Sequence, residues 1–305
     1  MKSKVNTLFM GFGKITESTD VAGFKKYIGV GNFKVLAVNP NAAELSTIYN
    51  TSIDKEPEYL GTSEVSVAGQ TKIFKQIRLD FFVQTVEDKN DDIKMIDKVS
   101  FFLVDCPQYN RDGSKVRVLN KYGENAWISK DLVAKGEVDQ NMRWYNTEGM
   151  KTALIGEVEV LEFLKAWLGI PVRTWRQDGV THEIENPDDA RAGLEKIKTY
   201  FSGNVAELKN LVKAMPEQMV KILFGVKTTD QGREFQDAFN RMFLKYRNSN
   251  FSYLKAQVED AQANGAYPNT KFEVVKLKEY EVGATDFSQG NPSLEVEDES
   301  DDLPF

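Results

Sequence analysis

Residues 72–84 read KIFKQIRLDFFVQ, and along most of this stretch apolar side chains alternate with polar or charged ones. Successive side chains of a β-strand point to opposite faces, so the alternation predicts a strand with two chemically different faces. The apolar face is expected in the core and comprises Ile73, Ile77, Leu79, Phe81 and Val83. The opposite face mixes cations with aromatic rings: Lys72, Phe74, Arg78 and Phe82, with Gln76, Asp80 and Gln84 between them.

Neighbouring segments show the same alternation, with turn-forming residues between them. In 94–104 the expected inward residues are Val99, Phe101 and Leu103, and the outward residues are Lys94, Lys98, Ser100 and Phe102. In 115–120 Val116 and Val118 oppose Lys115, Arg117 and, further along, Lys121. Residues 32–40 also have the composition of a strand. These segments predict a small antiparallel sheet or barrel over residues 1–148.

Residues 149–266 change to the spacing typical of helices and are expected to form a large helical insertion. One stripe ends before Gly169 and Pro171, and a second spans 187–201. Two more are expected after Pro216 and over 235–246. Alternation returns in 271–282, so 267–282 should be a strand that pairs with the first sheet. The predicted fold class is therefore α+β, with 283–305 as a disordered acidic tail.

Cysteine and histidine usage restricts the chemistry, because Cys106 and His182 are the only residues of their kinds. A closed Cys/His zinc site needs about four such ligands, and a nucleophilic triad would have to use His182. We expect no metal, no cofactor and no enzymatic activity. No apolar run approaches the roughly 18 residues that span a bilayer, and the N-terminus does not resemble a signal peptide, so we expect a cytoplasmic protein.

The negative charge of the chain is concentrated at one end. Of 46 acidic residues, eight lie in 281–305, which has no Lys or Arg. The other 38 lie in 1–280, which also contains all 39 basic residues. A nearly balanced body therefore carries an anionic tail, and a locally basic surface on that body is compatible with the net charge of -7.

The basic and aromatic strand faces fit single-stranded nucleic acid, because cations attract phosphates and rings stack on bases of any sequence. Further residues that could extend this surface are Tyr109, Arg111, Tyr122, Trp127, Arg143 and Trp144. The alternative is that Phe74, Phe82 and Phe102 are buried under a helical layer with the lysines at its rim. The strands alone favour neither interpretation.

The chain finishes EVEDESDDLPF, acidic until its last three residues. The tip formed by Asp301, Asp302, Leu303, Pro304 and Phe305 resembles the C-terminal tip of bacterial single-stranded-DNA-binding proteins, and several phage equivalents also end in acids and Phe. The strand-rich body is similar to an OB-type domain. Residues 112–128, DGSKVRVLNKYGENAWI, weakly resemble phage-encoded members. The resemblance implies a protein that coats single-stranded DNA in an infected bacterial cell.

By the same resemblance, the tip would recruit a polymerase, helicase, primase or recombinase during replication, recombination and repair. Two alternatives remain open. A metal-dependent nuclease with a similar tail could use strand acids, for which the candidates are Asp80, Asp97 and Asp105. A structural phage protein could carry the acidic end as a solubilising segment.

Overall fold

A computed structural model describes residues 25–67, 69–86, 93–110, 112–120, 124–136, 150–169, 172–177, 180–185, 204–248 and 250–280. The expected helix over 187–201 and the tail over 283–305 lie outside these ranges. The strands are β1 Tyr27–Val38, β2 Leu60–Val67, β3 Gln70–Thr85, β4 Ile96–Pro107, β5 Lys115–Leu119, β6 Asn125–Ser129, β7 Lys151–Thr152, β8 Leu154–Ile155, β9 Val172–Gln177, β10 Val180–Glu185, β11 Met219–Thr228, β12 Glu234–Ala238, β13 Leu244–Lys245, β14 Thr270–Phe272 and β15 Lys278–Glu279. The helices are α1 Ala42–Tyr49, α2 Lys130–Ala134, α3 Glu157–Leu168, α6 Ala206–Ala214 and α7 Phe251–Ala263.

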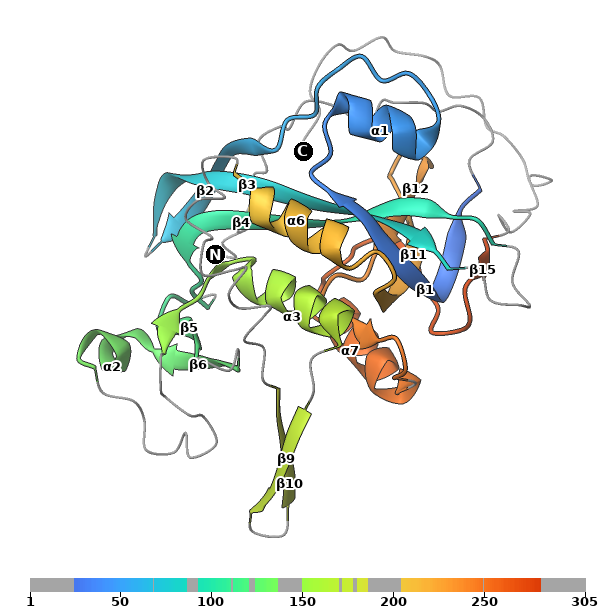
Figure 1. Ribbon diagram of the computed structural model, residues 1–305. Helices are drawn as coiled ribbons and strands as arrows, with labels where there is room; N and C mark the ends of the chain where they lie inside the picture. The colour runs from blue at the N-terminus through green and yellow to red at the C-terminus, as the bar shows by residue number, and fades with distance from the viewer. Residues whose placement is uncertain are drawn as a thin grey trace, which may run out of the picture.

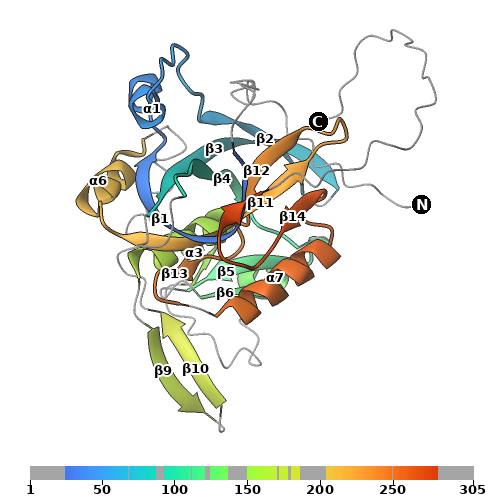
Figure 2. The ribbon, with the colours of Figure 1, turned by 90° about the vertical axis from the view of Figure 1, so that its right-hand side faces the viewer.

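The fold is mixed α+β and is built on a curled antiparallel sheet (Figure 1). The main path of this sheet is β12-β11-β1-β3-β4-β8; β13 and β14 also pair with β11, β15 with β1, and β2 with β3. A separate small sheet has the order β6-β5-β7, and β9 and β10 form a hairpin that projects from the body (Figures 1 and 2). No helix in the described ranges has the length and apolar character needed to cross a membrane.

One face of the curled sheet packs against α3 and α6, and this layer is the main hydrophobic core. Phe81 and Phe101 on adjacent strands both contact Phe163 of α3, with ring centroids 4.7 and 5.5 Å away. The expected inward residues of β3 from Ile77 to Val83, and those of β4, are buried here. The alternation in the sequence therefore identified the core face of both strands correctly.

Ile73 was also expected in the core and is instead 69% exposed. The pairing of β3 with β4 begins at Gln76, so the residues before it pair only with β2. We call this two-stranded extension, residues 62–67 and 70–75, the β2–β3 arm. Both of its faces carry exposed residues, and side-chain alternation alone does not reveal where a helical layer ends.

The first predicted helix is confirmed as α3, which begins after Gly156 and ends before Gly169. In the apolar stripe expected along this helix, Val158, Leu161, Leu164 and Trp167 are buried and Leu168 is half-buried. The Trp167 indole N–H donates to the Gln218 carbonyl oxygen over 3.2 Å. Gly156 has φ +83°, and a Cβ there would collide with the Phe102 carbonyl oxygen. A glycine is therefore required where the chain turns from β8 into this helix.

The predictions of a helix after Pro216 and of another over 235–246 are wrong. Met219–Thr228 is β11, an inner strand, and the second stretch contains β12, a loop and β13. Val220, Ile222 and Phe224 enter the main core, while Leu223 enters a second cluster on the other face with Phe239 and α7. A strand that is buried on both faces has a continuous apolar run, which also satisfies helical spacing.

The described part of 149–266 is consequently not a wholly helical insertion, because it supplies β11 to the sheet. Where a single returning strand was expected over 267–282, the structure has two short strands, β14 and β15. β14 pairs with β11, and β15 pairs with β1 at Tyr27 and Ile28. Helices α6 and α7 lie within the region expected to be helical, although their bounds were not predicted individually.

Candidate nucleic-acid interface

The structure separates the predicted site residues into groups. On or next to β3 and β4 lie Lys72, Phe74, Arg78, Phe82, Lys94, Lys98 and Phe102; around β5 and β6 lie Tyr109, Lys115, Arg117 and Trp127. Outside the described ranges are Arg111, Lys121, Tyr122, Arg143, Trp144, Asp301, Asp302, Leu303, Pro304 and Phe305.

The outer face of β3 and β4 is covered at its centre by the segment that runs from β1 through α1 to β2. Phe82 is 4% exposed and lies edge-on to the Tyr49 ring, with centroids 6.1 Å apart. Arg78 is 8% exposed, and its guanidinium carbon lies 5.5 Å from the centroid of the Tyr59 ring. Arg78 and Phe82 are thus interior groups of this structure, as the covered-face alternative anticipated for Phe82.

A capping motif explains why a helix forms over this face. The Asn41 side chain accepts a hydrogen bond from the Glu44 backbone N–H at 2.8 Å, and the Glu44 carboxylate accepts from the Asn41 backbone N–H at 2.9 Å. This reciprocal capping box starts α1, and the sequence NAAE at 41–44 is the signal that sequence reasoning missed.

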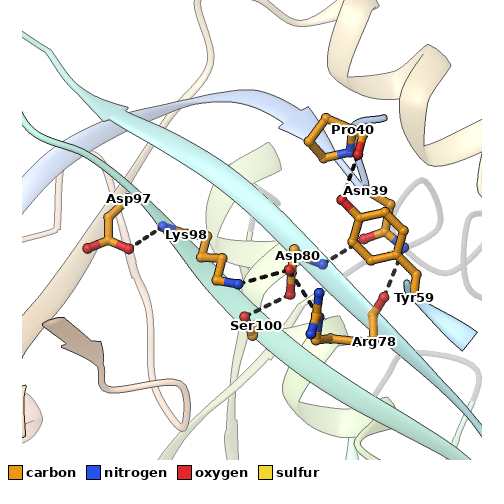
Figure 3. Close-up of polar contacts among 8 residues, drawn as sticks. All are labelled: Asn39, Pro40, Tyr59, Arg78, Asp80, Asp97, Lys98 and Ser100. Atoms are coloured by element: carbon orange, nitrogen blue, oxygen red, sulfur yellow. Dashed lines mark hydrogen bonds and ion pairs between the residues drawn. The ribbon is translucent and has the colours of Figure 1, made fainter. Parts of the chain in front are cut away.

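Beneath α1, the buried Asp80 carboxylate is the centre of a polar network (Figure 3). It accepts from the Ser100 hydroxyl at 2.8 Å and forms ion pairs with the Lys98 ammonium at 3.2 Å and the Arg78 guanidinium at 3.1 Å. These cations neutralise an internal carboxylate, which reduces their availability to a phosphate.

Asn39 and Tyr59 connect the covering segment to this network. The Asn39 amide oxygen accepts from the Asp80 backbone N–H at 2.7 Å, and its amide nitrogen donates to the Arg78 carbonyl oxygen at 2.9 Å. The Tyr59 hydroxyl donates to the Pro40 carbonyl oxygen at 2.7 Å. Burial, with Asp80 nearby, raises the pKa of Tyr59 well above its ordinary value, so its hydroxyl stays protonated as a donor.

The three strand acids considered for a nuclease do not converge. Asp80 lies on the outer face, whereas Asp97 pairs with Val83 and shares the opposite face; Asp105 is exposed near the far end of β4. In the part of the chain that the structure describes, no group of three or more Cys, His, Asp or Glu residues is placed to hold a metal ion.

Asp97, at the N-terminal end of β4, has a pKa that can be tested by its effect on stability. Burial is the main cause that raises its pKa to about 6, with Asp237 adding to the effect and the Lys98 backbone N–H and ammonium opposing it. Because the folded-state pKa lies above the ordinary value of 3.8, the ionised side chain disfavours folding above pH 6. That penalty disappears as the pH falls from 6 towards 4.

We expect Asp97→Asn to stabilise the protein at pH 8, because asparagine keeps the acceptor for the Lys98 N–H and cannot ionise. At 1.36 kcal/mol per pKa unit the full shift would be worth about 3 kcal/mol, and partial hydration of this half-buried group reduces our expectation to about 1 kcal/mol. Urea unfolding at several pH values measures the gain. If the stability gained by Asp97→Asn did not shrink between pH 8 and pH 4, the raised pKa of Asp97 would be contradicted.

The β2–β3 arm presents predicted site residues to solvent. Lys72 is exposed and Phe74 is half-buried on one face, and Ile73 and Lys75 are exposed on the other. Lys72 is close enough to Cys106 on β4 for its charge to lower the pKa of that thiol, against the larger opposite effect of burial. The arm therefore lies beside the end of β4 that leads towards β5.

The small sheet has one apolar and one basic face. Val116, Val118, Ala126 and Ile128 form a buried cluster against α2, and Tyr109 packs against this cluster. Tyr109 thus lies on the apolar side. The opposite face carries the exposed Lys115 together with Arg117 and Trp127, which are cross-strand partners.

Arg117 and Trp127 form an ordered pair. The guanidinium carbon lies 5.7 Å from the Trp127 ring centroid, and the guanidinium donates to Asn125 at 3.1 Å and to Glu159 of α3 at 3.1 Å. Trp127 remains 41% exposed. The arginine thus fixes an indole ring that is open to solvent, although Glu159 partly neutralises its charge.

On the β2–β3 arm and the basic face of the small sheet, the predicted groups that remain exposed or half-buried without a described ion pair are Lys72, Phe74, Lys115 and Trp127. Together with Arg117, whose side chain is 18% exposed and orders the Trp127 ring, we call them the candidate interface. The β2–β3 arm and the β5–β6 sheet both lie at the left-hand end of the molecule in Figure 1. Of the other predicted residues, Lys94 precedes the opposite end of β4, Lys98 pairs with Asp80, and Phe102 is half-buried opposite Arg78.

No protein family, curated protein or solved structure that was compared with the chain matches it.

Proposed function

We propose that the protein is a non-enzymatic single-stranded-DNA-binding protein, and that its curled sheet is an OB-type domain. The observation that carries the proposal is the exposed Trp127 ring held by Arg117, with Lys115 on the same face and Lys72 and Phe74 on the nearby arm. Exposed rings gain little from water and stack on unpaired bases, while the ammonium groups attract phosphates. Sequence-independent coating of a single strand requires both kinds of contact.

The recruitment of replication, recombination and repair enzymes belongs to the same proposal. It rests on the sequence of 301–305 and on the acidic segment before it, which lie outside the described residues. A Leu-Pro-Phe segment offers an apolar docking group, and the acids steer it towards basic partners.

A fluorescence titration with oligothymidine at increasing NaCl concentrations tests DNA binding. We expect quenching of tryptophan emission and an affinity that falls with salt, with a log–log slope of about -0.7 per phosphate contacted. Trp127→Phe keeps an aromatic ring and should retain binding while removing the share of the quenching that comes from Trp127. Trp167 is fully buried and should contribute none, so any quenching that remains would come from Trp144 or Trp175. The absence of binding at low salt would refute the proposal, and Mg²⁺-dependent cleavage of the oligonucleotide would replace it with the nuclease alternative.

Phe305→Ala tests recruitment separately from DNA binding. The substitution leaves every acidic side chain of 281–305 in place and removes the aromatic ring, so DNA affinity should stay within about twofold while capture of partner enzymes from a host lysate is lost. Quantitative pull-downs with wild-type and variant protein measure the difference.

A variant that lacks 283–305 is the contrasting control. Removing seven of the tail's eight acids removes a competitor for the basic surface, so single strands should bind more tightly, most visibly at low salt where screening is weakest. If the wild-type and Phe305→Ala proteins captured identical sets of partners, the tail would be interpreted as a solubilising segment without a recruitment role.

A further inference from the structure

A second exposed surface with cations and aromatic rings lies around β13 and the start of α7, far along the sequence from the candidate interface. Its three aromatic rings are exposed: Tyr246 at 40%, Phe251 at 39% and Tyr253 at 53%. The side chains of Arg247 and Lys255 are also exposed. We call these five residues the α7 surface.

The sequence around this surface contains basic residues and no acidic ones. Residues 238–258 contain Arg241, Lys245, Arg247 and Lys255 and no acidic residue. The first acid that follows, Glu259, lies 3.9 Å from Lys255, and both side chains are about two-thirds exposed, so this pair is weak. This stretch of the chain therefore carries a net positive charge although the whole chain is negative.

Core packing does not account for the exposed rings. Helix α7 is held to β11 by Leu254, Val258 and Ala261, which pack with Leu223 and Phe239. Phe251 and Tyr253 are not part of that cluster. Two aromatic side chains at the start of the helix thus face solvent without contributing to the buried face of the helix.

Tyr246 is fixed by a basic residue, as Trp127 is. The Lys221 ammonium lies 5.0 Å from the centre of the Tyr246 ring and donates to the Tyr246 carbonyl oxygen. Burial lowers the pKa of Lys221, which agrees with an ammonium partly withdrawn from water between β11 and β13. A cation close to an exposed aromatic ring therefore occurs both in the candidate interface, at Trp127, and on the α7 surface, at Tyr246.

We propose that the α7 surface is a second binding region for single-stranded nucleic acid, with Arg247 and Lys255 contacting phosphates and Phe251 and Tyr253 stacking on bases. The proposal rests on the proposed function and extends it, because it assigns a separate part of the binding path. Cations alone would satisfy an acidic peptide, whereas exposed rings among the cations fit a ligand with alternating phosphates and flat bases.

The two regions are separate in space. In Figure 1, α7 lies at the lower right and β5–β6 at the lower left, with α3 between them; viewed from the side in Figure 2, α7 lies in front of β5–β6. A strand that occupies both regions must therefore pass α3, and an oligonucleotide long enough to reach both is needed to detect the second one.

Long oligothymidine binding to the full-length protein tests the α7 surface with two double variants. Arg247→Ala/Lys255→Ala should make the salt slope shallower by about 1.4, because two phosphate contacts at about 0.7 each are lost. Phe251→Ala/Tyr253→Ala should lower affinity about tenfold or more and leave the slope unchanged. All four side chains are exposed, so thermal unfolding midpoints should stay at the wild-type value.

Lys213→Ala on α6 is the matched control for loss of an exposed cation. If the wild-type protein fails to bind oligothymidine, the proposed function fails. If wild type binds and both double variants behave like the control, only the second region is refuted. The second region is also refuted if the variants bind DNA normally but lose affinity for a synthetic peptide of residues 283–305, since the surface would then recognise an acidic peptide.

Discussion

Asp80→Ala is expected to lower the free energy of unfolding by about 3–5 kcal/mol, the range found when one partner of a buried ion pair is removed. Asp80 is 1% exposed and forms ion pairs with Arg78 and Lys98. Without the Asp80 carboxylate, the guanidinium of the buried Arg78 loses its carboxylate partner, and the Ser100 hydroxyl loses its acceptor. The outer layer formed by α1 should loosen first, since the network lies directly beneath it.

Urea unfolding followed by circular dichroism measures this loss. Asp54→Ala is a matched control, because the same side chain is removed from an exposed position where its hydroxyl partner, Ser52, also faces solvent. The control should change stability by less than about 0.5 kcal/mol. If Asp80→Ala unfolded within about 1 kcal/mol of wild type, the network would not be a principal support of the α1 layer.

Loss of the two rings of the candidate interface is the largest effect expected on binding. Stacking on an aromatic side chain is worth roughly 1–3 kcal/mol per base, so Phe74→Ala/Trp127→Ala together should weaken oligothymidine binding by about thirtyfold or more. The salt slope should stay unchanged because no cation is removed.

The matched control is Phe74→Tyr/Trp127→Phe, which keeps a ring at both positions and should retain affinity to within a few-fold. Fluorescence anisotropy with a labelled oligonucleotide avoids dependence on the tryptophan that is replaced. The assignment of Phe74 and Trp127 to the interface would be wrong if the alanine variant bound as tightly as this control. Lys72→Ala/Lys115→Ala should instead make the salt slope shallower.

Sequence periodicity predicted the parts of this fold in which one face is buried. Ile77 to Val83 and Val99 to Leu103 alternate because α3 covers one side of their strands. The spacing within 157–168 predicted α3 for the same reason. In β11 both faces are buried, so Leu223 is as apolar as its neighbours, and the pattern no longer distinguishes strand from helix.

The accessible part of the predicted site depended on information that alternation does not contain. The same pattern placed Phe74 and Phe82 on one face of β3, yet α1 covers Phe82 and the β2–β3 arm exposes Lys72 close to Phe74. Which residues stay accessible is decided by a segment 30–40 positions earlier in the chain, whose capping box at Asn41 was the available signal. The helical spacing of 235–246 likewise predicts a core position for Tyr246, whose ring is exposed.

The pairing of β1 with β11 has a consequence for how the chain folds as it is synthesised. Gly29 lies opposite Phe224, and β15 pairs with β1 from still later in the chain. While residues 1–218 emerge from the ribosome, β1 can pair with β3 but lacks its other neighbour. Contacts between such distant residues slow folding, and an open apolar strand edge is a site of misassembly. Nascent chains arrested before β11 should therefore depend strongly on chaperones, and those that extend beyond β15 should not.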